Sequence, residues 1–203
     1  MRARAVPGIP ADPKVHSGGC APVARNLPAL ATFSTGTVMD VIRIFRHLFA
    51  EGSGRRHFPS ATLDAIQRAI AEGEERHDGQ VCFAIEGALP LRNLFGGQSA
   101  RDRANEVFAH LRVWDTERNS GVLIYVLLPD HAIEIVADRG IAARVAPAEW
   151  QAMCDRLRER FAAGEFERGA VEGVAAASAI LAVHFPADAS ARPNELPDRP
   201  VVL

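Results

Sequence analysis

The sequence has few of the features of secreted, membrane-spanning or thiolate-metal proteins. It holds three cysteines, Cys20, Cys82 and Cys154. Their odd number and the lack of C-x-x-C spacing predict neither a disulfide framework nor a thiolate zinc site. The longest stretch with little polar character, residues 174–183, is well short of the ~20 apolar residues of a membrane-spanning helix. We therefore predict no membrane span and a cytoplasmic location, where thiols stay reduced.

The chain also has no large excess of positive or negative charge. The chain carries 23 basic and 25 acidic residues, a formal net charge of -2. Such a balance gives no field strong enough to attract nucleic acid, and no nucleic-acid partner is predicted. The basic stretch over residues 43–57 is interpreted as a solvated helix face and the linker that follows it.

Familiar catalytic motifs are also missing. The histidines show neither H-x-x-x-H nor H-E-x-x-H spacing, which argues against a zinc site built from histidine. No G-x-S-x-G surrounds a serine, and Cys82 lies in the middle of an expected strand, where a thiol usually behaves as a small buried apolar group. The sequence identifies no catalytic residue, so whether the protein is an enzyme stays open at this point.

Proline is concentrated at the two ends of the chain. Residues 1–38 lack periodicity and contain Pro7, Pro10, Pro13, Pro22 and Pro28. They are predicted to form a disordered N-terminal arm, with translation starting at Met39 as the alternative. Residues 188–203, which carry Pro193, Pro197 and Pro200, are predicted to form a disordered tail. One domain, residues 39–187, lies between them.

Apolar residues at helical spacing predict helices over 40–50, from Ser60, from Ser99, and twice after Pro147. Strands are predicted at 80–86 and 121–128, which are apolar on both faces, and at 132–138, whose alternation is typical of a half-exposed edge strand.

The order of these elements predicts the fold class. A strand, a helix and a strand imply a right-handed parallel crossover, and the turn at Pro129 makes the third strand antiparallel. The result is α/β: a three-layer α/β/α sandwich with a small mixed β-sheet, built from a parallel βαβ crossover plus an antiparallel hairpin.

Acidic and amide side chains gather around the second strand. Asp115, Glu117 and Asn119 precede it, and Asp138 ends the third strand. Because the third strand is antiparallel, its end lies at the edge where the second begins, and the four side chains are expected to be neighbours. Oxygen ligands at alternate positions are typical of Ca²⁺ or Mg²⁺ sites. Ordinary turn chemistry is the other interpretation.

The loop is not an EF-hand. Gly121 comes one place late, and Val126 stands where the bidentate glutamate of that motif belongs. A looser metal site formed by Asp115, Glu117, Asn119 and Asp138 with water is the remaining metal hypothesis.

A second candidate site precedes the helix that starts after Ser99. Gly96, Gly97, Ser99 and Arg101 form a flexible turn at a helix N-terminus, where backbone N–H groups favour an anion. Ser99 is equally suited to cap the helix, and the spacing matches neither a P-loop nor a dinucleotide fingerprint. Capping is the preferred interpretation of these residues, and weak anion binding is the alternative.

Three motifs resemble the TPM domain family: WDTERNSGVLIYVLL from Trp114, AIEIVADRGI from Ala132, and FAAGEFERGAVEGV from Phe161. The resemblance spans about residues 40–185. It implies an α/β/α sandwich. Plant members of the family are linked to photosystem repair and an acid phosphatase activity, and some bacterial members look like divalent-cation binders. Many relatives carry consecutive acids where this chain has Asn119 and Ser120. One carboxylate fewer implies weaker binding of a hard cation.

Two functional hypotheses follow. In the first, the protein is a non-catalytic domain that binds Ca²⁺ or Mg²⁺ weakly and acts through a protein partner. In the second, it is a metal-assisted acid phosphatase, in which a cation polarises a phosphoryl oxygen and a carboxylate orients water. The first is preferred because only Arg118 and Arg139 lie near the acids in sequence as possible phosphate clamps.

Overall fold

The computed structural model describes residues 35–50, 52–187 and 194–203, and residues 35–40 by their backbone only. The helices are α1 (Thr35–Leu48), α2 (Ser53–His57), α3 (Ser60–Glu74), α4 (Leu91–Phe95), α5 (Ala100–His110), α6 (Arg139–Ala142), α7 (Pro147–Ala162) and α8 (Phe166–His184). The strands are β1 (Gln80–Glu86), β2 (Gly121–Leu127), β3 (Ala132–Ala137) and β4 (Val201–Val202).

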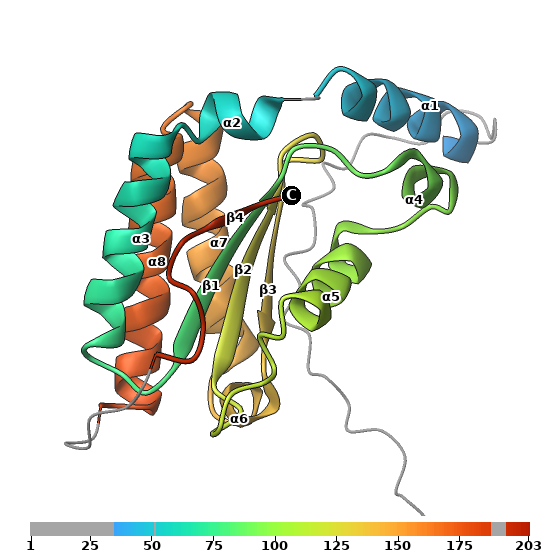
Figure 1. Ribbon diagram of the computed structural model, residues 1–203. Helices are drawn as coiled ribbons and strands as arrows, with labels where there is room; N and C mark the ends of the chain where they lie inside the picture. Colours follow the sequence, from blue (N-terminus) through green and yellow to red (C-terminus); the bar gives the residue numbers. More distant parts are fainter. Residues whose placement is uncertain (1–34, 51, 188–193) are drawn as a thin grey trace, which may run out of the picture.

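The four strands form one mixed sheet in the order β3-β2-β1-β4. β1 and β2 are parallel, with Gln80 opposite Gly121. β2 and β3 are antiparallel, with Val122 opposite Ala137. Helices α3, α7 and α8 cover one face, and α5 lies over the other (Figure 1). The α/β class, the parallel crossover and the antiparallel hairpin are therefore confirmed.

Alternating side chains of the central strands divide the core into two clusters. Val122, Ile124 and Val126 of β2 belong to the cluster beneath α3, α7 and α8. Leu123 and Tyr125 belong to the cluster beneath α5, as does Leu127. Every residue of β2 is buried. The run GVLIYVLL predicted this position, because only a strand covered on both faces is apolar at every residue.

β3 is more buried than its sequence pattern predicts. Only Ala132 is partly exposed, because α5 packs on one face of the strand and α7 on the other. Glu134, expected to face solvent, is buried, with one carboxylate oxygen 3.6 Å from Nη1 of Arg101. β3 lies at the edge of the sheet, as predicted. The prediction that it is half exposed is wrong, because the nearby Arg101 replaces part of the solvation of the Glu134 carboxylate.

The two ends of the described chain also differ from the predictions. Val201 and Val202 form β4 beside β1, although the sequence predicts a disordered tail there. Two apolar residues carry no detectable period, and here they cover an open strand edge. α1 begins at Thr35, within the predicted arm. Residues 1–34 and 188–193 lie outside the described residues, so the remaining domain boundaries and the Met39 start stay predictions.

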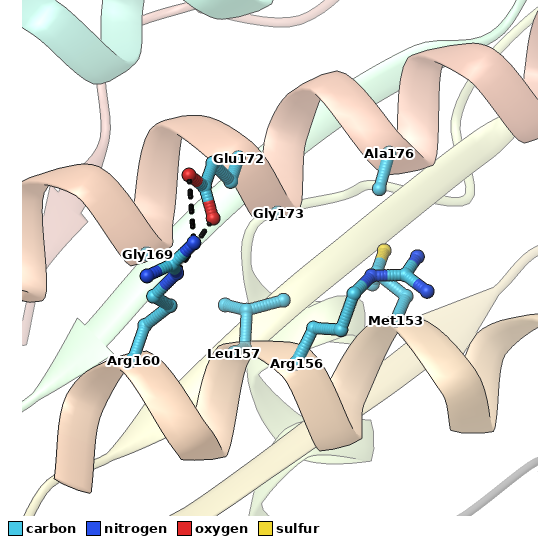
Figure 2. A pocket seen from close by; sticks show the side chains of 8 residues that line it. All are labelled: Met153, Arg156, Leu157, Arg160, Gly169, Glu172, Gly173 and Ala176. Atoms are coloured by element: carbon cyan, nitrogen blue, oxygen red, sulfur yellow. Dashed lines mark hydrogen bonds and ion pairs between the residues drawn. The ribbon is translucent and has the colours of Figure 1, made fainter. Parts of the chain in front are cut away.

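Glycine allows α8 to approach α7 closely (Figure 2). A Cβ added to Gly173 would lie 2.6 Å from Leu157 Cδ1, and one added to Gly169 would lie 2.7 Å from Arg160 Cβ. Arg160 then reaches across to Glu172, with Nε 2.8 Å from Oε2. The space left between the helices is only ≈ 20 Å³. Glycine thus fixes the distance between α7 and α8.

We expect Gly173→Ala to destabilise the protein by about 1–3 kcal/mol, because the added methyl group overlaps Leu157. The free-energy cost of this overlap is expected to exceed the gain in helix propensity from glycine to alanine. Urea unfolding measures this change. In a double mutant with Leu157→Ala, the cost should be smaller than the sum of the two single costs, since the methyl group then enters the vacated space. Strictly additive costs would contradict the proposed contact.

The start of β1 is held by a partly buried acid at the end of α3. Glu74 Oε1 accepts a hydrogen bond from the N–H of Val81 at 2.8 Å. Burial raises the pKa of the Glu74 carboxyl from 4.5 to about 7, the bond from Val81 opposes this rise, and Asp198 adds to it. The acid is therefore partly protonated near neutral pH.

Because the pKa of Glu74 is higher in the folded chain, its stabilising effect is complete below pH 4.5 and is lost as pH rises through about 7. We expect Glu74→Gln, which keeps an acceptor for Val81, to gain about 1–3 kcal/mol relative to wild type across that range. Unfolding curves at several pH values test this. Glu72→Gln, an exposed change on the same helix, is the control and should show no such gain.

Candidate functional site

The loop before β2 and the end of β3 meet through backbone contacts. The N–H of Asp138 donates to Gly121 O at 2.9 Å, and the N–H of Gly140 donates to Asn119 O at 3.1 Å. A Cβ added to Gly140 would lie 2.5 Å from Asn119 O, and one added to Gly121 would lie 1.9 Å from Val113 O. Glycine at these two positions allows the loop to lie directly against both strands.

Asn119 and Asp138 are neighbours, as predicted, and Arg139 stands between them. Asn119 has a left-handed backbone, with φ 53°, and its Oδ1 accepts a hydrogen bond from Arg139 Nε at 2.8 Å. Asp138 Oδ1 accepts one from the N–H of Arg139 at 2.6 Å. Two of the predicted ligands therefore lie at one junction, with their oxygens already engaged by the same residue.

The two carboxylate oxygens of Asp138 differ in their hydrogen bonding. Asp138 Oδ2 is buried and has no hydrogen-bond partner among the residues that the structure describes. Burial raises the pKa of the Asp138 carboxyl, whereas the bond from the Arg139 N–H and the charge of Arg139 lower it. An unsatisfied buried oxygen is unfavourable, and a cation or a water molecule would relieve it.

Asp115 and Glu117 lie on the exposed side of the loop. Glu195, from the C-terminal segment, also reaches this loop, where its Oε2 accepts a hydrogen bond from the Glu117 N–H at 2.8 Å. Among the side chains that the structure describes, in residues 41–50, 52–187 and 194–203, no group of three or more His, Cys, Asp or Glu is placed to hold a metal ion. The structure brings Asn119 and Asp138 together and spreads the remaining acids over the loop.

The turn before α5 is occupied by capping. Ser99 Oγ accepts a hydrogen bond from the Asp102 N–H at 3.0 Å, as an N-cap does. Gly97 has a φ of 67°, which explains the glycine there. Arg101 points to β3, where Nη1 donates to Ile135 O at 2.5 Å. With Arg101 engaged elsewhere, Gly96, Gly97 and Ser99 stay an untested anion-site prediction.

A buried polar network that sequence reasoning missed lies beneath α5. Glu86 accepts hydrogen bonds from Arg103 Nε at 2.9 Å, from Arg103 Nη2 at 2.8 Å and from the Tyr125 hydroxyl at 2.5 Å. Burial raises the pKa of Tyr125, and the bonds to Glu86 raise that of Arg103. From the sequence, Arg103 was recognisable only as a residue in the first turns of α5. Its pairing with Glu86 joins α5 to the sheet.

A second missed network joins α1 to the β2–β3 turn. Asp130 accepts a hydrogen bond from Arg43 Nε at 2.9 Å and contacts His47 Nε2 at 3.1 Å. His47 Nδ1 accepts from the Leu89 N–H at 2.9 Å, which assigns the proton of the neutral ring to Nε2. Burial lowers the pKa of His47. Both nitrogens of this ring are engaged, and the network serves packing.

Comparison with known proteins identifies the family. The model of the TPM domain (TPM_phosphatase) matches residues 56–180, more than half of the chain. The chain belongs to the TPM domain family. No curated protein matches this TPM domain protein. Its structure is similar to that of the BA42 protein from the psychrophilic bacterium Bizionia argentinensis, solved by NMR, with 28% sequence identity, a TM-score of 0.63, and coverage of 71% of this chain and 94% of BA42.

The structure gives physical roles to glycines and aromatic residues in the three motifs that resemble the TPM domain family. Gly121 lies in the first motif and Gly140 in the second, and both allow the close approach at the Asn119–Asp138 junction. In the third, Gly164 has a φ of 79° just after α7, and Phe166 packs against Phe161, with ring centroids 5.2 Å apart. None of the helices that the structure describes has the length and apolarity to cross a membrane.

We expect Gly140→Ala to cost about 1–3 kcal/mol, because a methyl group 2.5 Å from Asn119 O forces the loop away from α6. Thermal and urea unfolding measure the cost. Gly87→Ala is the matched control, since its Cβ would meet nothing closer than 3.4 Å. Equal stability of the two variants would show that the loop yields freely and is not held against Gly140.

Proposed function

We propose that the protein binds a divalent cation, Ca²⁺ or Mg²⁺, at the junction of the 113–120 loop with the end of β3, and that it acts through a protein partner. Asp138 would be the central ligand and Asn119 its neighbour, with Asp115 and Glu117 recruited from the loop. The observation that carries the proposal is the buried Oδ2 of Asp138, which lacks a hydrogen-bond partner among the described residues.

The donor set suits a hard cation. Carboxylate and amide oxygens are the ligands that Ca²⁺ and Mg²⁺ prefer, and both keep water in part of their coordination shell. A cation beside Asp138 would favour the ionised carboxylate that burial disfavours.

The same geometry predicts weak binding. Asn119 Oδ1 must leave Arg139 Nε, now 2.8 Å away, before it can bind a metal. The exposed acids must be ordered around the ion, which costs conformational entropy. We therefore place the affinity in the range of weak sites, about 10⁻⁴–10⁻³ M.

Metal-assisted phosphatase activity is the second candidate, and the name of the matching family model, TPM_phosphatase, supports it. A cation at Asp138 would polarise a phosphoryl oxygen, and a carboxylate would orient water. The cationic side chains nearby already have partners: Arg118 Nη1 lies 2.8 Å from Asp78 Oδ2, and Arg139 binds Asn119. The geometry therefore favours binding over turnover.

We expect millimolar Ca²⁺ or Mg²⁺ to raise the melting temperature of the wild-type protein, because a ligand that binds only the folded state stabilises it. Asp138→Asn should abolish the rise and should not itself destabilise the protein, since the amide keeps an acceptor for Arg139 and removes a buried charge. Asp64→Asn, a change to an acid half exposed on α3, should leave the response intact.

A phosphomonoester assay on the same proteins separates the two candidates. Cation-dependent turnover that Asp138→Asn abolishes would select the phosphatase, whereas a thermal response without turnover selects the binding domain. If neither ion changes the melting temperature of the wild-type protein, or if Asp138→Asn responds as the wild type does, the proposed site is refuted.

A further inference from the structure

A second cavity lies at the other end of the sheet from Asp138. It has a volume of ≈ 520 Å³ and opens beside the β2–β3 turn, between that turn and the end of α7. Figure 1 shows this turn at the end of the sheet away from α6, the helix that follows Asp138. We call it the hairpin pocket. Its lining comes from β2, β3, α2, α7 and α8.

The interior of the hairpin pocket is apolar. Phe161 and Phe166 line it, their ring centroids 5.2 Å apart and their planes inclined by 32°. Leu128 and Ile133 contribute from the hairpin. Pockets for small molecules have volumes of about 300–1,000 Å³ and mostly apolar walls with a few polar groups. The hairpin pocket meets both conditions.

The polar side chains of its lining are two histidines and one arginine. They are His57 from α2, His131 from the turn and Arg158 from α7, and no acidic side chain is among the described residues of the lining. Arg158 Nη1 also pairs with Asp155 Oδ1 at 2.5 Å, on the exposed side of the same helix. Three elements distant in sequence thus bring cationic or hydrogen-bonding groups to the mouth of an apolar cavity.

We infer that the hairpin pocket binds an amphiphilic monocarboxylate, with its apolar body lying against the two packed phenylalanine rings and its carboxylate at Arg158 and the histidines. A planar guanidinium matches the geometry of a carboxylate. The positive charge would disfavour a cationic amphiphile with the same apolar body. This site is independent of the cation proposal, since β2 separates the two and no residue is shared.

Three probes of equal chain length test the ligand class: decanoate and decyltrimethylammonium, kept below their micelle concentrations, and decanol, kept below its solubility limit. ¹H–¹⁵N NMR titration of the full chain reports where each binds. We expect decanoate to shift the amide signals of residues 128, 130–133 and 158–166, decanol to shift the same signals with weaker affinity, and the cation to bind weakest. Equal binding of the three, or shifts centred elsewhere, would overturn the inference.

Two variants separate charge from cavity. Arg158→Gln should weaken decanoate binding about tenfold, as expected for the loss of a charged hydrogen bond, and change decanol binding less than twofold. Arg156→Gln, on the same helix but outside the pocket lining, should change neither. Ala162→Trp, at an exposed lining position, should block both probes. If Arg158→Gln binds decanoate as tightly as the wild type does, the inference that Arg158 binds the carboxylate is wrong.

Discussion

The antiparallel pairing of β2 with β3 is the constraint on which the rest of the structure depends. It returns the chain to the edge where β2 begins, so that Asp138 donates its backbone N–H to Gly121. A parallel third strand would place Asp138 at the opposite edge of the sheet. Glycine then closes the remaining distance, because a Cβ on Gly140 would overlap Asn119. Backbone geometry therefore sets the candidate site before any side chain contributes to it.

The buried acids of the protein differ in how fully they are satisfied, and this difference separates structural from candidate functional groups. Glu86 accepts bonds from Arg103 and Tyr125. An acid satisfied in this way has no capacity left for a ligand without a loss of stability. Asp138 keeps one oxygen without a hydrogen-bond partner among the described residues. Glu134 also has a buried oxygen, Oε2, without a hydrogen-bond partner among the described residues, but that oxygen lies 3.6 Å from Nη1 of Arg101. Asp138 instead lies beside the loop that carries the exposed acids Asp115 and Glu117, which is the environment that the cation proposal requires.

The sequence predicted the three longer strands well, but it missed β4 and most side-chain contacts, for physical reasons. An unbroken apolar run over residues 121–127 has one stable place, the middle of a covered sheet. Alternation in β3 was misleading, because a buried ion pair between Glu134 and Arg101 replaces water. The positions of Asn119 and Asp138 followed from topology. That Arg139 already binds Asn119 did not, because side-chain direction depends on contacts between segments distant in the chain.

A strand that is buried at every residue can offer chemistry only at its ends. β2 is such a strand, and its two ends have opposite character. At Gly121 the neighbouring loop supplies carboxylate and amide oxygens. At Leu127 the neighbouring cavity is apolar, with basic groups among its lining. The proposed cation site and the proposed monocarboxylate site lie at these opposite ends, so the buried strand would keep the two apart.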